Sequence, residues 1–204
     1  MATDAVQTSA QGDSVVVADG RRQRSERSRQ AIIDALLALM EEGNLTPTAQ
    51  QTSDRAGVGI RTVFRHFNDM ESLFATADEQ TRDAGEALYL GGDRSGSLQE
   101  RILHAVQRHA DGFEAQRNII LSTSAQLWRF EILRKNYARY QKGLRKDLGN
   151  WLPELQHLSE LDREAVDAVA SFEMWHRLRE HQGLSKETST EIIVSVLSGL
   201  VPDA

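Results

Sequence analysis

Apolar side chains recur at three- and four-residue spacing along most of the chain, which predicts a series of amphipathic helices. The first such helix begins near Ser25 and ends at Gly43–Asn44, where glycine and asparagine are typical of a helix C-terminus. Its apolar stripe consists of Ile32, Ile33, Leu36, Leu37, Leu39 and Met40. Residues 1–20 lack such a pattern apart from Val15–Val17, and we interpret residues 1–24 as a disordered tail.

Two short helices follow the first one. Thr46 is the expected N-cap of the second helix, with Pro47 at its first position, and Gly57 limits this helix to about Ala56. The third helix is expected at Ile60–His66. A fourth begins after Asn68 or Asp69 and extends to about Leu88–Leu90, where a glycine-rich loop is interpreted as a plain linker.

The remaining residues predict further helices without strands. Their expected ranges are Leu98–Glu114, Asn118–Leu152 with its subdivision left open, Arg163–His181, and a last helix capped by Ser185. The sequence thus predicts an all-α fold of about nine helices, in which residues 25–74 form a first domain and residues 75–204 a helical bundle.

Charge is distributed unevenly along this chain, whose net charge is −6. Residues 21–70 contain eight arginines against six acidic residues, and five of these arginines lie within RRQRSERSR at residues 21–29. Such asymmetry is typical of a separate DNA-contacting module. The absence of cysteine excludes disulfides and thiolate metal sites. Without a long apolar run or a signal-like N-terminus, we expect a cytoplasmic protein that does not span a membrane.

Gly57 lies between the second and third helices, where a glycine can adopt the left-handed conformation of a sharp turn. Small residues at Ser53 and Ala56 permit a close helix crossing, which predicts a helix-turn-helix unit. Val63 and Phe67 are expected to face inwards. The opposite face would present Arg61, Thr62, Arg65 and His66 to DNA, where arginine can pair with guanine. A helical hairpin within a larger bundle is the alternative, although it leaves the clustered arginines unexplained.

The segment AGVGIRTVFRHFNDMESLF at residues 56–74, together with the helix before it, resembles the DNA-binding domain of TetR-family bacterial transcriptional regulators. Ala56, Gly57, Val58, Thr62, Val63, His66, Phe67, Glu71 and Leu73 match the family pattern in register. The stretch from Ser171 to Ser185 also resembles a segment of some members. The resemblance implies a dimeric regulator, expected to be a repressor, with an effector-binding second domain joined to the first by the fourth helix.

Some positions depart from the family pattern. Gly59, Phe64 and Met70 replace a serine, a tyrosine and a lysine that usually contribute phosphate contacts, and Thr52-Ser53 replaces an apolar pair. The arginines of residues 21–29 are expected to compensate, as an arm along the phosphates or in a minor groove. The candidate DNA-binding residues are Arg21, Arg22, Arg24, Arg27, Thr48, Gly59, Ile60, Arg61, Thr62, Phe64, Arg65, His66 and Met70.

The second domain offers a candidate ligand site and a candidate dimer interface. Aromatic residues suggest a pocket between helices, lined by Phe113, Trp128, Tyr137, Phe172 and Trp175. For each of these residues taken singly, ordinary core packing is the alternative. The last two helices provide apolar and small residues for a two-fold interface: Val166, Val169, Ala170, Ile192, Ser195, Val196, Gly199 and Leu200.

We find no catalytic signature in the sequence, and its histidine pairs are five residues apart, unlike metal ligands on one helical face. We therefore expect no enzyme activity, no cofactor and no bound metal. The expected partners are a double-stranded DNA operator, a small-molecule effector and a second copy of the chain. The alternative function is that of a helical protein that sequesters a ligand or binds a partner, and whose helix-turn-helix unit no longer binds DNA.

Overall fold

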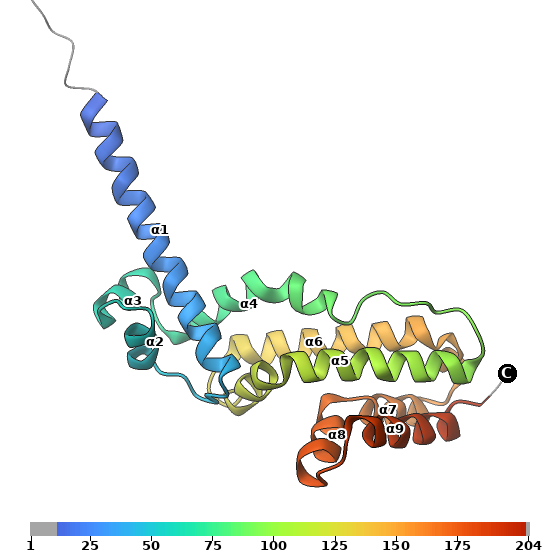
Figure 1. Cartoon of the computed structure of the whole chain (residues 1–204). Coiled ribbons are helices and arrows are strands. Elements are labelled where there is room, and N and C mark those ends of the chain that lie inside the picture. The colour runs from blue at the N-terminus through green and yellow to red at the C-terminus, as the bar shows by residue number, and fades with distance from the viewer. Residues whose placement is uncertain (1–11, 203–204) are drawn as a thin grey trace, which may run out of the picture.

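The computed structural model describes residues 12–202, which form helices and short turns without any strand (Figure 1). Helices α1 (Gly12–Glu41), α2 (Ala49–Arg55) and α3 (Ile60–His66) gather at one end. Helices α4 (Met70–Ala87), α5 (Leu98–Ala125) and α6 (Glu131–Trp151) run along the body. Below α5 lie α7 (Glu160–Val169), α8 (Phe172–His176) and α9 (Lys186–Leu200). The predicted all-α fold with about nine helices is confirmed.

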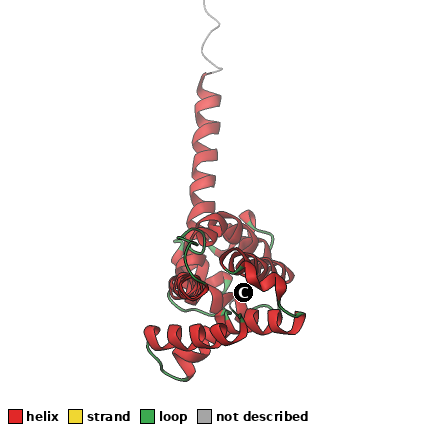
Figure 2. Cartoon of the chain, turned by 90° about the vertical axis from the view of Figure 1, so that its right-hand side faces the viewer, coloured by secondary structure: helices red, strands yellow, loops and turns green. Residues whose placement is uncertain are grey.

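Helix α1 is longer than the sequence pattern predicted. It begins at Gly12 rather than near Ser25, and its N-terminal half projects from the body as a single helix (Figure 2). The tail expected over residues 1–24 is therefore wrong for residues 12–24, and its first 11 residues lie outside the described part. At residues 21–24 the helix is extended by arginine and glutamine, which tolerate helical backbone well and need no apolar stripe once the helix is nucleated.

Side-chain caps set the starts of the next helices. Thr48, not Thr46, caps α2: its hydroxyl accepts from the Gln51 backbone N–H at 3.2 Å, and the Gln51 side chain accepts from the Thr48 N–H at 2.9 Å. Asp69 caps α4 in the same way, with Ser72 as the reciprocal partner. Helix α3 has the predicted bounds.

The long apolar runs of the second half are divided at two places. Helix α5 continues past Glu114 to Ala125, and a turn over residues 126–130 separates it from α6. The predicted helix Arg163–His181 is interrupted because the Ser171 hydroxyl accepts from the Met174 N–H at 3.2 Å and so starts a new helix. Helix α8 then passes into a π-helical turn at Arg177–His181, and a 3₁₀ turn at Pro153–His157 follows α6.

Two apolar cores hold the chain together. The first joins α1, α3 and the start of α4, and includes Ile32, Leu36 and Leu73. Phe130 and Leu133, at the start of α6, also belong to this core, so the two predicted domains share side chains across the boundary at residue 74. The second core lies between α5 and the helices α6–α9, with Trp151 and Phe113 among its largest buried side chains.

The glycine-rich loop between α4 and α5 is fixed to the second core. Gly91, Gly92 and Gly96 have φ angles between 91° and 99°, which only glycine adopts easily. Arg94 of this loop forms an ion pair with the buried Asp147 at 2.8 Å and lies over the Trp151 ring. The loop is therefore a packed segment as well as a connection.

Candidate nucleic-acid interface and effector cavity

Helices α2 and α3 meet at the sharp turn that the sequence predicted. Gly57 has a φ of 65°, and the Val58 N–H donates to the Ser53 carbonyl at 3.0 Å across the turn. Thr52 and Ser53 are fully buried at the crossing. Their hydroxyls donate to the Thr48 and Gln50 carbonyls, both at 2.9 Å, so the polar pair leaves no unsatisfied group in the first core.

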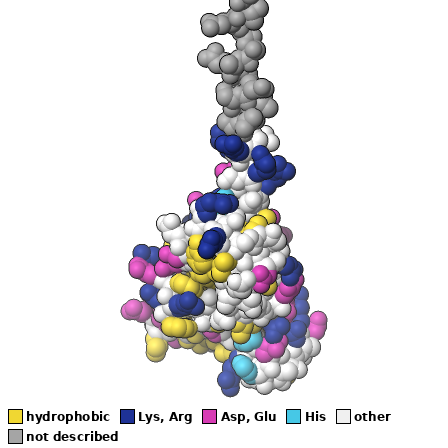
Figure 3. Space-filling view, turned by 90° about the vertical axis from the view of Figure 1, so that its left-hand side faces the viewer, with side chains coloured by type: hydrophobic (Ala, Val, Ile, Leu, Met, Phe, Trp, Pro, Cys, Tyr) yellow, Lys and Arg dark blue, Asp and Glu magenta, His cyan; other side chains and the backbone are white. Residues whose placement is uncertain are grey.

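The two faces of α3 differ as expected. Val63 and the following Phe67 are buried in the first core. Arg61 and Arg65 are exposed, and neither forms an ion pair or hydrogen bond with any residue in the described part of the chain. Ile60 and Phe64, which directly precede the two arginines in the sequence, are exposed to 38% and 48%. Figure 3 shows arginine and apolar side chains together on this end of the molecule.

His66 closes the exposed face at the C-terminal end of α3. Its side chain is partly buried, and burial together with the charges of Arg65 and Arg29 lowers the pKa of its imidazole. Its Nε2 is buried without a hydrogen-bond partner among the described residues. The imidazole is therefore held in its neutral form.

Three of the candidate DNA contacts have other surroundings. The Thr48 side chain is used as the α2 cap. Gly59 is the N-cap of α3, where its carbonyl accepts from the Thr62 N–H at 2.7 Å and no side chain supplies a capping bond. Met70 is partly buried against the first core, and its predicted contact with DNA stays a prediction.

The basic segment of α1 is exposed. Arg21, Arg22, Arg24 and Arg27 all face water, and Arg24 and Arg27 donate to carbonyls one turn earlier on the same helix. Arg29 instead lies over the Phe67 ring at 5.2 Å and connects α1 with α3. The positive charge thus extends away from α3 on a helix rather than on an extended arm.

A cavity of about 420 Å³ lies between α4, α5 and α6, next to the C-terminal end of α1. Its apolar wall contains side chains from both cores, among them Met40, Phe74 and Ile120. This size and this mostly apolar lining are typical of small-molecule sites. Because Met40 and Phe74 also form the first core, anything that fills the cavity contacts the packing that supports α3.

Tyrosine hydroxyls provide polar groups in the cavity wall. The hydroxyls of Tyr89 and Tyr140 are 2.9 Å apart, and Tyr89 also donates to Gln116 Oε1 at 3.2 Å. Burial raises the pKa of both tyrosines, so both hydroxyls stay neutral and can donate and accept hydrogen bonds. Tyr137, the third tyrosine of the wall, donates to Glu173 at 2.5 Å.

Of the five predicted ligand residues, only Tyr137 lines this cavity. Phe113, Phe172 and Trp175 belong to the second core, where the Phe113 and Phe172 rings pack at a centroid distance of 5.7 Å. Trp128 is 81% exposed in the turn between α5 and α6. The cavity residues that the sequence did not indicate lie mainly on α4 and α6, for example Ala77 and Leu133, whose helical spacing is the same as that of an ordinary core residue.

Helix α9 has an exposed apolar stripe. Ile192, Ser195, Val196 and Gly199 are all exposed, and a Cβ atom at Gly199 would meet nothing within 4 Å. Val166 is fully buried in the second core, so its predicted place in an interface is wrong: α7 packs this side chain inwards. Val169, Ala170 and Leu200 are partly buried against the same core.

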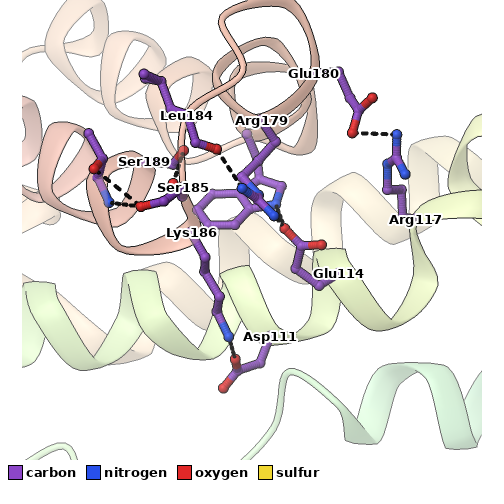
Figure 4. A network of polar contacts seen from close by, with 11 residues as sticks. Asp111, Glu114, Arg117, Arg179, Glu180, Leu184, Ser185, Lys186 and Ser189 are labelled. Atoms are coloured by element: carbon purple, nitrogen blue, oxygen red, sulfur yellow. Dashed lines mark hydrogen bonds and ion pairs between the residues drawn. The ribbon is translucent and has the colours of Figure 1, made fainter.

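Three polar contacts join successive turns of α5 to the segment that leads into α9 (Figure 4). Asp111 pairs with Lys186, Glu114 accepts from Arg179 Nε at 2.7 Å, and Arg117 pairs with Glu180. The Trp175 indole N–H also donates to Glu114, at 3.1 Å. These contacts join α5, of which Gln116, Ile119 and Ile120 line the cavity, to α8, the π-helical turn and the first residue of α9.

No helix within residues 12–202 is long and apolar enough to span a membrane. The described residues also contain no group of three or more histidine and acidic side chains that could hold a metal ion.

Solved structures identify the fold. The chain superposes on a TetR-family transcriptional regulator from Streptomyces coelicolor with a TM-score of 0.63 and 18% identity, covering 84% of this chain and 81% of that one. With a transcriptional regulator from Rhodococcus sp. Rha1, the TM-score is 0.61 and the identity 18%, over 87% and 95% of the two chains. No family model matches the sequence, and no curated protein matches it significantly.

Proposed function

Since the chain has the TetR-like fold of these regulators, we propose that it is a DNA-binding transcriptional regulator of the bacterial cytoplasm. In this proposal it binds its operator as a homodimer and represses transcription until a small-molecule effector releases it. The observation that carries the proposal is the exposed face of α3, where Arg61 and Arg65 are free of partners in the described structure.

The geometry of this face suits major-groove recognition. Helix α3 is short and supported from behind by Val63 and Phe67, so its exposed side can enter a groove while the first core stays intact. Arg61 and Arg65 are one turn apart and can each form a bidentate contact with a guanine. The α1 arginines add charge for phosphate contacts, which position a protein on DNA without specifying sequence.

The cavity supports effector control. It adjoins Met40 and Phe74 of the first core, and α4 forms one of its walls. A ligand that binds one position of α4 better than another shifts the population towards that position. In a dimer, such a shift changes the separation of the two α3 helices, which must match half-sites about 34–36 Å apart or a multiple of that distance.

The exposed stripe of α9 supports self-association. Ile192 and Val196 are 36% and 41% exposed, and Ser195 and Gly199 leave room for a second helix to approach. A two-fold interface brings the same stripe from each copy together.

Selection of bound sequences from random duplex DNA tests this function. We expect the full chain to enrich a two-fold symmetric site, because a symmetric dimer presents two copies of α3. The double variant Arg61→Ala/Arg65→Ala should enrich nothing. As a matched control, Arg177→Ala removes an exposed arginine from the π-helical turn and should enrich the same site. Absence of enrichment by the unmodified chain would refute the proposal.

A sequestering protein without DNA-binding activity is the second candidate. It is favoured by Met70, which has no charge to pair with a phosphate, and by Phe64, which has no hydroxyl to offer one. For this candidate, a small molecule should bind the cavity with no enrichment of any DNA sequence.

A further inference from the structure

One edge of the cavity is formed by a row of cations on α6. Arg139, Lys142 and Lys146 all line the cavity, and their spacing of three and four residues places them on one side of the helix. Lys142 and Lys146 are exposed, and neither forms an ion pair or hydrogen bond within the described residues. The row therefore has positive charge available at the cavity mouth.

The acidic residues of the lining do not balance this charge. Asp78 is shared by two guanidinium groups, Arg82 at 2.9 Å and Arg139 at 2.8 Å. Asp147 accepts from Arg94, the His109 ring and the Trp151 indole, at distances of 2.8 to 3.1 Å. Only Glu86, which is exposed, remains among the acidic lining residues of the described structure to face the lysines.

Arg82 adds a second indication of an anion. One of its terminal nitrogens binds Asp78, but its Nε is buried and has no hydrogen-bond partner among the described residues. A buried donor without an acceptor costs free energy, which an acceptor atom of a ligand would recover. Arg82 lines the cavity, on the α4 wall that faces α6.

The interior of the cavity is different from its mouth. Its wall is apolar, with Phe74, Ile120 and Leu133, and the Tyr89–Tyr140 hydroxyl pair is neutral. A ligand charged along its length would lose hydration there without recovering it. An apolar body with one polar end suits this distribution.

We propose that the cavity binds an amphipathic monocarboxylate, with its apolar body between α4, α5 and α6 and its carboxylate at the mouth near Lys142, Lys146 and Arg82. This inference deepens the proposed function, because it names the chemical class of the effector. The inference depends on the proposed function in one respect, because it treats the cavity as the site where the effector binds.

Binding of three ten-carbon probes to the full chain tests the charge preference. Decanoate, decanol and decylammonium share one apolar body, and isothermal calorimetry measures their affinities. We expect decanoate to bind at least 3-fold more tightly than decanol, and decylammonium to bind most weakly. Equal affinities, or tighter binding of decylammonium, would overturn the proposal.

Two lysine substitutions locate the carboxylate. Lys142→Gln/Lys146→Gln should weaken decanoate binding about 3- to 10-fold, as expected when two exposed charge interactions are removed, and leave decanol binding within about 2-fold. Lys135→Gln is the matched control, because Lys135 lies on the same helix outside the cavity and pairs with Glu131. Decanoate binding that is equal in the double variant and the control would refute the assigned mouth.

A further variant locates the apolar body. Gly143 lines the cavity, and a Cβ atom there would meet nothing within 4 Å, so Gly143→Leu should fold and occupy the cavity near its mouth. Both decanoate and decanol should then bind at least 10-fold more weakly, with unchanged helical circular dichroism. Unchanged binding of both probes would place their site elsewhere and overturn the proposal.

The inference and the proposed function fail in different measurements. Operator binding without any probe reports on the DNA-binding function alone, and probe binding without DNA reports on the ligand class alone. A chain that binds an operator but prefers decanol refutes the ligand class and leaves the regulator standing. A chain that binds decanoate as described but enriches no DNA sequence refutes the regulator and leaves the ligand class standing.

Discussion

Arg61 and Arg65 are the residues on which sequence recognition depends in the proposed complex. If either reads a base, its substitution by alanine should cost about 1–3 kcal/mol of operator binding and relax specificity at one position of the site. The free energy of unfolding should change by less than about 0.5 kcal/mol, because neither side chain has a partner in the described structure. Titrations against the selected operator and its point variants measure the binding effects, and urea unfolding measures the stability.

The pattern of weakening separates the roles of these arginines. Equal weakening on every DNA sequence identifies the residue as a phosphate contact rather than a base contact. Full operator affinity in both single variants and in the double variant would show that neither arginine contacts the operator, and it would overturn the role proposed for the exposed face of α3.

Two glycines inside helices should respond to alanine in opposite ways. A Cβ atom at Gly112 in α5 would lie 2.3 Å from the Tyr89 ring, so Gly112→Ala should destabilise the protein by about 1–3 kcal/mol through overpacking. Gly143→Ala in α6 meets no neighbour and should stabilise by up to about 1 kcal/mol through helix propensity. Urea unfolding of both variants measures the contrast. Equal effects would show that the Tyr89 contact does not limit position 112.

Aromatic residues show the limit of sequence reasoning at this scale. Phe113 and Tyr137 both occupy inward positions of helices, yet Phe113 lies in the second core and Tyr137 lines the cavity. Helical spacing identifies which side chains face inwards. It does not tell whether those side chains touch the neighbouring helix or are separated from it by a cavity. The cavity depends on that separation, which is set by packing between helices far apart in the sequence.

At the scale of helices, the short elements of the first domain were the most predictable. Helix α3 has the predicted bounds because Gly57 and Gly59 precede it and Asp69 begins the next helix, all of which are local signals. The break at Ser171 was missed because its capping bond lies within an otherwise continuous helical pattern. The start of α1 was missed because residues 12–24 have no apolar stripe at helical spacing.

The helical form of the α1 arginines leads to a prediction for this element. Arg21→Gln/Arg22→Gln/Arg24→Gln should leave the thermal midpoint unchanged, because all three side chains are exposed and glutamine tolerates helical backbone. The slope of log affinity against log salt should become shallower by about 0.9 for each phosphate that is no longer neutralised. DNA titrations at several salt concentrations measure this slope, and an unchanged slope would mean that the segment does not touch DNA.

A proline at Ser25 tests whether the arginines act from a helix. Ser25→Pro keeps every charge but interrupts α1 between the arginines and the packed part of the helix. If the helix positions them, operator affinity should fall and the salt slope should become shallower. An affinity and slope equal to those of the unmodified chain would indicate an arm that binds without helical structure.

At the scale of the whole molecule, the two cores and the cavity form one connected system. The first core supports α3 and reaches the cavity through Met40 and Phe74, and the second core reaches it through Tyr89 and Ile120. From the second core, the contacts of α5 with Lys186, Arg179 and Glu180 lead to α9. A ligand in the cavity thus lies between the surface proposed to read DNA and the surface proposed to pair two copies.

The last prediction tests the pairing of copies. Gly199 lies in the exposed stripe of α9 with open space around it, so Gly199→Arg can be accommodated within one chain. In a two-fold interface the same side chain would place an unpaired charge between helices, which costs several kcal/mol. We therefore expect monomers in sedimentation, helical circular dichroism close to that of the unmodified chain, and weak operator binding, since each half-site must then be bound separately.

Gly149→Arg provides the matched control for this prediction. It makes the same substitution at another helical glycine, on α6, where a Cβ atom also meets nothing within 4 Å. This control should remain dimeric and bind the operator normally, so that a difference between the two variants reflects the position of the charge and not its presence. A Gly199→Arg variant that sediments as a dimer and binds the operator with full affinity would place the interface away from the α9 stripe, because a buried arginine without a partner is incompatible with a closely packed two-fold seam.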